Sequence, residues 1–77
     1  MKRFDNVSYD PQANACYITI HDDKKIVDSV IFNKDVMIDK DQEWEIVGVE
    51  IINASSHYDF INKLLLSRDS IEACVSY

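Results

Sequence analysis

The sequence predicts an α+β domain: an antiparallel sheet of four or five strands in meander order, with a C-terminal helix packed on one face. Three observations support this. Short segments of alternating apolar and polar residues recur up to residue 55, polar turns separate them, and a helical spacing of apolar residues follows. We expect the 77 residues to form a single domain, 1–77, with residues 1–55 in the sheet and 56–77 in a helical segment.

The first predicted strands form a hairpin. Residues 3–9 give a weak strand signal that stops at Asp10-Pro11, where proline favours a turn. Residues 15–20 then alternate clearly, with Cys16 and Ile18 on one face and Tyr17 on the other.

The middle of the chain predicts strands over residues 26–32, 36–38 and 44–52, separated by polar turns. The last of these carries Val47, Val49 and Ile51 on one face, and Ile46, Gly48, Glu50 and Ile52 on the other. A half-solvated sheet is polar on its outer face, so we expect the second face to be covered in part by a symmetric homodimer. Gly48 within a strand indicates a bulge or a close backbone approach.

The spacing predicts a helix over residues 56–66. Ser56 is the expected N-cap, and Asp59 suits the positive end of the helix dipole. Tyr58, Ile61, Leu64 and Leu65 fall at helical spacing. Residues 67–70 interrupt the pattern, and Ser70 could cap a final helical turn.

Charge and cysteine content narrow the class of protein. The net charge is -6, from 14 acidic and 8 basic side chains, and no basic stripe is present, which argues against direct binding of nucleic acid. The acidity suits a basic protein partner, a metal or solubility alone. With two cysteines, no apolar leader and no apolar run of roughly 20 residues, we expect a cytoplasmic protein with reduced thiols and no membrane contact.

Two motifs carry a family resemblance. Tyr9-Asp10-Pro11 leads into the strand at residues 15–20, and Ile-Val-Gly-Val-Glu-Ile-Ile-Asn-Ala-Ser closes the unit at residues 46–55. In this order the motifs resemble the bacterial and phage family catalogued as domain of unknown function 2283, over residues 7–55. The resemblance implies an antiparallel sheet and no known catalytic residues. Genes of the family often lie beside genes for small toxin-like proteins, which suggests an antitoxin or inhibitor role.

The chain departs from the family pattern at two positions. Glu43-Trp44 stands where the family has an acidic residue followed by glycine, and Trp is poorly suited to the positive φ that glycine adopts. We therefore expect this turn to differ in shape. Cys16 stands where members carry Leu, which favours a packing role.

The acidic turn also has the spacing of a calcium loop. Asp39, Asp41, Glu43, Glu45 and Glu50 fall at ligand positions 1, 3, 5, 7 and 12 of such a loop. Position 6 requires glycine and is Trp44, and the flanking residues have strand patterns, so we expect a solvated turn without calcium.

The residues give little support for zinc binding or for catalysis. His21, Cys16, His57 and Cys74 are enough in number for zinc, but no pair has the close spacing of zinc ligands, and His21-Asp22-Asp23 lacks further ligands. Nucleophilic catalysis needs a base and oxyanion donors, and the chain has no glycine-rich elbow. We therefore predict no enzyme, no metal and no cofactor.

The predicted function is binding. We expect a non-enzymatic small acidic protein that restrains a basic partner protein, as an antitoxin does, and that forms a homo-oligomer. The alternative is an oligomeric protein that binds or sequesters a small anionic or nucleotide-like ligand. Because tryptophan is a common binding hot spot, we place the partner surface on the acidic hairpin tip. Its predicted residues are Asp39, Asp41, Glu43, Trp44 and Glu45.

Overall fold

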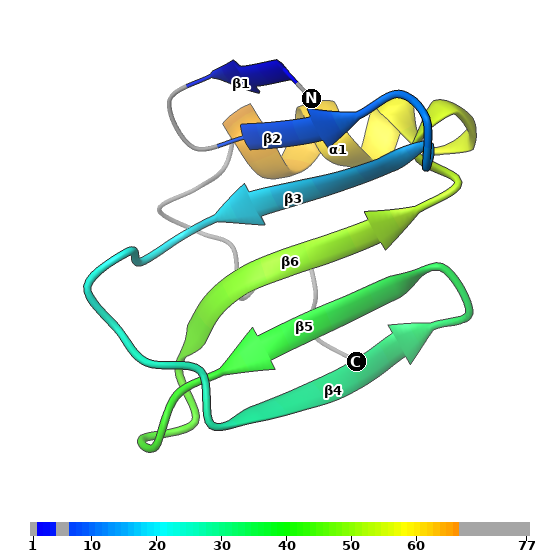
Figure 1. The fold of residues 1–77 in the computed structure, drawn as a ribbon. Coiled ribbons are helices and arrows are strands. Elements are labelled where there is room, and N and C mark those ends of the chain that lie inside the picture. The colour runs from blue at the N-terminus through cyan, green and yellow to red at the C-terminus, as the bar shows by residue number, and fades with distance from the viewer. Residues whose placement is uncertain (1, 5–6, 67–77) are drawn as a thin grey trace.

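The computed structural model, which describes residues 2–4 and 7–66, is one antiparallel sheet followed by a helix (Figure 1). The strands are β1 (Lys2–Phe4), β2 (Val7–Asp10), β3 (Ala15–Thr19), β4 (Asp28–Asn33), β5 (Val36–Lys40) and β6 (Ile46–Ile52). A 3₁₀ turn, η1 (Ala54–Ser56), leads into α1 (Tyr58–Leu66). The α+β class, the antiparallel sheet and the C-terminal helix are confirmed. Five of the strands have four to seven residues each, and β1 is a sixth strand of three residues at one edge of the sheet.

The strand order differs from the predicted meander. In space the order is β1-β2-β3-β6-β5-β4, so β3 pairs with β6 instead of β4. Strands β4, β5 and β6 are joined by hairpins, and β6 returns beside β3, which is a Greek-key arrangement. Burial explains this order, because β3 and β6 carry fully buried side chains while β4 is mostly exposed. The most apolar strands therefore occupy the centre of the sheet.

One face of the sheet forms the core with α1. Two rows of paired residues cross the three central strands on this face: Ile18, Val49 and Ile38, and Cys16, Ile51 and Val36. All six are at most 4% exposed, and Leu64 of α1 packs on them with no exposed surface. Figure 1 shows α1 behind the sheet. The rings of Phe32 on β4 and Phe60 on α1 stack with centroids 6.1 Å apart.

A bulge in β6 changes which residues face the core. Lys40 pairs with Ile46 and Asp39 with Gly48, so Val47 is the extra residue. The backbone N–H groups of Ile20 and His21 both donate to the Val47 carbonyl, at 2.8 and 3.0 Å. Ile46 therefore joins the core with Val49 and Ile51, and its predicted place on the opposite face is wrong.

Two predicted boundaries also change. The single strand expected over residues 3–9 is two strands, β1 and β2, that pair with each other. The helix begins at Tyr58, because Asn53 adopts a left-handed conformation and Ser56 belongs to η1. The predictions for residues 67–77 lie outside the described residues. Within the described part of the chain, no helix is long and apolar enough to span a membrane.

Candidate functional site

The turn between β5 and β6 is organised by Asp41. Its carboxylate accepts hydrogen bonds from the N–H groups of Glu45 at 2.8 Å and Glu43 at 2.9 Å. Lys24, from the connection after β3, pairs with the same carboxylate at 3.4 Å. The bond from the Glu45 N–H, together with those from Lys24 and Glu43, lowers the pKa of Asp41. Asp41 is 6% exposed, so it fixes the turn and offers no surface to a partner.

Trp44 lies at the tip of this turn, and its side chain is 55% exposed. Its backbone is left-handed, with φ of 68°, the conformation that the sequence argument expected Trp to avoid. The Trp44 N–H donates to the Asp41 carbonyl at 3.0 Å. The Lys40 ammonium donates to the Trp44 carbonyl at 3.3 Å and lies 5.6 Å from the ring centroid. The turn thus holds a bulky residue where glycine would be unstrained.

Asp39 belongs to the sheet and not to the tip. It is 7% exposed, accepts a hydrogen bond from the Tyr17 hydroxyl at 2.7 Å and another from the Ser29 hydroxyl at 2.6 Å. Burial, with the hydrogen bond to Asp39, raises the pKa of Tyr17. Asp39 therefore joins β3, β5 and β4 on the face opposite the helix.

Gly48 makes the Tyr17–Asp39 contact possible. A Cβ atom added at Gly48 would lie 2.3 Å from the Tyr17 hydroxyl oxygen, because the Tyr17 ring crosses β6 at this residue. The predicted close approach at Gly48 is confirmed.

The five predicted site residues therefore divide into two groups. Glu43, Trp44 and Glu45 are exposed, and we call these three residues the acidic tip. Asp39 and Asp41 are buried and bonded within the fold, so their placement on the partner surface is wrong. Their donors lie far away in the sequence or in the backbone, which charge spacing alone does not reveal. Lys24 also pairs with Glu45, at 3.3 Å.

The possible metal ligands do not converge. Among residues 2–4 and 7–66, no three His, Cys, Asp or Glu side chains are placed to hold a metal ion. In the calcium pattern, Asp39 and Asp41 are already bonded by protein donors, and Glu50 lies in β6. Cys16 of the zinc set is buried, and Cys74 lies outside the described residues.

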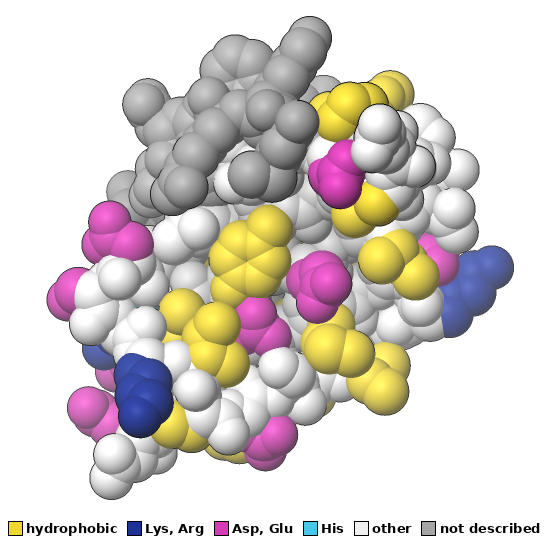
Figure 2. Space-filling model, in the orientation of Figure 1, with side chains coloured by type: hydrophobic (Ala, Val, Ile, Leu, Met, Phe, Trp, Pro, Cys, Tyr) yellow, Lys and Arg dark blue, Asp and Glu magenta, His cyan; other side chains and the backbone are white. Residues whose placement is uncertain are grey.

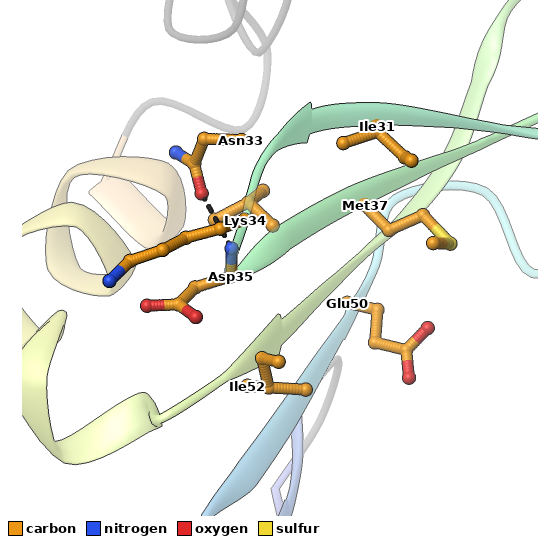
Figure 3. A pocket seen from close by; sticks show the side chains of 8 residues that line it. Ile31, Asn33, Lys34, Asp35, Met37, Glu50 and Ile52 are labelled. Atoms are coloured by element: carbon orange, nitrogen blue, oxygen red, sulfur yellow. Dashed lines mark hydrogen bonds between the residues drawn. The ribbon is translucent and has the colours of Figure 1, made fainter.

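The face opposite α1, which we call the open face, combines apolar and acidic side chains (Figure 2). One row of paired residues crosses it from β3 to β4: Tyr17, Glu50, Met37 and Ile31. Ile31 is 68% exposed and Ile52 is 45% exposed. A hollow of about 210 Å³ lies between the side chains of β4, β5 and β6 (Figure 3). Its walls include Ile31, Lys34, Asp35, Met37, Glu50 and Ile52.

Asp35, at one end of this hollow, ties the β4–β5 turn to the start of the helix. Its carboxylate lies 2.8 Å from Nε2 of His57, and it accepts from the Asn53 amide at 3.4 Å. The contact with His57, supported by Asn53, lowers the pKa of Asp35. The predicted helix over residues 56–66 includes His57, but no sequence pattern indicates its partner, because Asp35 lies in a turn 22 residues away.

The two motifs of the family resemblance meet beside this contact. Asn14 accepts a hydrogen bond from the Ser55 N–H at 3.1 Å and donates to the Ser55 hydroxyl at 3.0 Å. Asn14 and Asn53 both have φ of 52°. The loop after the first motif is thus hydrogen-bonded to the last residue of the second motif, just before the helix begins.

These features define a small α+β domain with one helix-covered sheet face, one open face and an acidic hairpin tip. The chain belongs to the family described as "Protein of unknown function (DUF2283)", whose model matches residues 6–55. The match spans β2 to β6, so the predicted resemblance is confirmed and α1 lies beyond it. Searches of curated proteins and of solved structures found no match.

Proposed function

We propose that this chain is a non-enzymatic cytoplasmic protein that binds and restrains a basic partner protein, as an antitoxin does. The net charge of -6 supports this class of partner, because opposite charge speeds encounter and selects against acidic proteins. Residues that could serve catalysis have other roles. Cys16 is 4% exposed, burial raises the pKa of its thiol, and His57 is bonded to Asp35.

The observation that carries the proposal is the conformation of Trp44. A bulky residue in a left-handed conformation costs about 1–3 kcal/mol, yet the Trp44 ring stays 55% exposed and adds little to the core. Strain of this kind is found where the side chain serves function. Trp is also among the residues that contribute most to protein interfaces.

The surroundings of Trp44 suit a basic partner. Glu43 and Glu45 flank the ring in the sequence and are exposed, with Glu45 paired to Lys24. The Lys40 ammonium lies 5.6 Å from the ring centroid, which is the kind of contact that a cationic side chain of a partner would make with an aromatic ring. Asp41 fixes the turn through two hydrogen bonds and one ion pair, so little conformational freedom would be lost on binding.

The test begins with partner identification. A tagged copy expressed in its source cells is expected to retain one basic protein, which is then purified and titrated against variants. Trp44→Ala should weaken binding by about 2 kcal/mol or more, roughly thirtyfold in Kd. Tyr58→Ala is the matched control, since Tyr58 is an aromatic residue on α1 with 56% exposure. An acidic partner, or equal loss in both variants, would reject the acidic tip as the binding surface.

The alternative of small-ligand binding rests on the hollow of the open face. Its volume of about 210 Å³ is below the roughly 300–1,000 Å³ of typical ligand sites. Glu50 on its wall would repel an anion. A panel of nucleotides and small anions in thermal unfolding decides between the two functions: a concentration-dependent rise in Tm with one ligand supports sequestration.

A further inference from the structure

The open face exposes apolar side chains to water, and a second protein layer packed on this face would bury them. Ile31 and Ile52, 68% and 45% exposed, stand on two sides of the hollow, and Met37 lies between Ile31 and Glu50 (Figure 3). The helix covers the other face, where the core lies. A 77-residue chain buries only about 60% of its unfolded surface. A further buried layer on the open face would therefore add to its stability.

We infer that the open face is an interface with a second copy of this chain, related by a two-fold axis that lies between the two faces and crosses the mouth of the hollow. A symmetric interface must be complementary to itself. The hollow meets this condition in charge: Lys34 and Glu50 are both exposed, and Figure 3 shows them on opposite sides of it.

The position of these two charges fixes the arrangement. An axis lying between the two faces, and perpendicular to the line from Lys34 to Glu50, places each lysine over the glutamate of the other copy. Two equivalent ion pairs result. Ile31 and Ile52 lie on the remaining two sides of the hollow, near this axis, so each isoleucine meets its own counterpart. Apolar contacts at the centre are then flanked by ion pairs, as in protein interfaces generally.

The same charges favour a second copy over a basic partner at this face. Asp35, the other acid of the hollow, contacts His57 at 2.8 Å, and the neighbouring Lys34 interacts with it only through the longer-range attraction that helps to lower its pKa. Neither Lys34 nor Glu50 takes part in an ion pair among residues 7–66. A uniformly basic partner would pair with Glu50 but repel Lys34, and it suits the acidic tip better.

The test is the mass in solution, measured by sedimentation equilibrium over a range of micromolar concentrations. The full chain is expected to give twice the monomer mass of 8.9 kDa. Lys34→Glu and Glu50→Lys should each raise the dimer dissociation constant at least about tenfold, because each replaces two attractive contacts with two repulsive ones. The double variant Lys34→Glu/Glu50→Lys restores opposite charges and should recover the dimer.

Two controls carry the same charge changes away from the hollow. Lys63→Glu on α1 and Glu43→Lys at the tip alter exposed residues, and both should leave the dimer intact, as should Trp44→Ala. A wild-type monomer, single variants that match their controls, or a double variant that stays monomeric would each overturn the inference. If a variant does not fold, dilution of the wild type under NMR decides instead. Amide shifts of Lys34, Met37 and Glu50 should then move while those of the tip stay constant, and the reverse pattern would contradict the inference.

Discussion

The two faces of the sheet are stabilised by different interactions. On the helix-covered face, rows of aliphatic side chains such as Ile18, Val49 and Ile38 pack under Leu64 with at most 2% exposure. On the open face, Tyr17 crosses β6 to reach the buried carboxylate of Asp39. The first face depends on volume and non-directional burial, and the second on hydrogen bonds with fixed geometry.

This difference teaches how each face responds to substitution. On the covered face, a smaller side chain should lower the free energy of unfolding, because a cavity remains. On the open face, a side chain added at Gly48 should lower it, because the Tyr17 ring occupies that space.

The largest effect is expected on the covered face. Leu64→Ala removes a side chain with no exposed surface from the helix-sheet contact and should lower the free energy of unfolding by about 3–4 kcal/mol. Chemical denaturation measures this loss. Leu66→Ala on the same helix is the control, since Leu66 is 87% exposed and its loss should be near zero. Similar losses in the two variants would show that α1 does not seal this face.

Gly48→Val should cost about 2–3 kcal/mol, through overpacking and the loss of the hydrogen bond to Asp39. Tyr17→Phe, which removes only the hydroxyl, separates these causes and should cost about 1–2 kcal/mol. In Tyr17→Ala the ring is gone, so adding Gly48→Val to it should cost much less than it does in the wild type. Strictly additive losses would mean that Gly48 and Tyr17 act independently.

The elements of the fold followed from the sequence, but their arrangement did not. Alternation at residues 15–20 and helical spacing after residue 55 locate β3 and α1 because each pattern is local. The pairing of β3 with β6 depends on contacts between segments more than 20 residues apart. The face on which Ile46 lies was also predicted wrongly, because the extra residue of the bulge, Val47, reverses the alternation of side chains along β6.

The candidate site divides in the same way. The sequence located the acidic tip, because its charges and its only tryptophan are local features. It did not distinguish Asp39 and Asp41 from Glu43 and Glu45, because all four alternate along one segment. What separates them is their hydrogen-bond donors, which are the Tyr17 and Ser29 hydroxyls for Asp39 and two backbone N–H groups of the turn for Asp41. Lys24 does not distinguish them, because it pairs with both Asp41 and Glu45.

A smaller effect is expected at Asp35, which links the β4–β5 turn to the residues before the helix. Its lowered pKa means that the carboxylate stabilises the fold fully above the unfolded value of about 3.9, and that this contribution is lost as the pH falls through the lower folded value. His57→Ala should raise the pKa of Asp35 toward its ordinary value, which carboxyl NMR titration measures. Asn53→Ala should raise it less, because that contact is longer, at 3.4 Å against 2.8 Å. An unchanged pKa in His57→Ala would mean that the contact does not control Asp35.

The smallest effect on stability is expected at Trp44. Trp44→Gly is expected to increase stability, whereas the substitutions on the two faces of the sheet are expected to decrease it. Trp44→Gly relieves a left-handed conformation that costs about 1–3 kcal/mol for a bulky residue. It also gives back about 0.5–1 kcal/mol through the greater freedom of glycine in the unfolded chain, and it loses the contact with Lys40. The net change should be a gain of no more than about 1 kcal/mol.

Trp44→Ala provides the comparison for this prediction. Alanine keeps the unfavourable φ of 68° and loses the ring contact with Lys40, so thermal unfolding should rank glycine above the wild type and alanine below it. Both variants should lose affinity for the basic partner. A substitution that makes the protein more stable and weakens binding would identify Trp44 as a residue kept for function. If the glycine variant is less stable than the alanine variant, the left-handed conformation is not a source of strain, and Trp44 is not a residue kept at a cost in stability for binding.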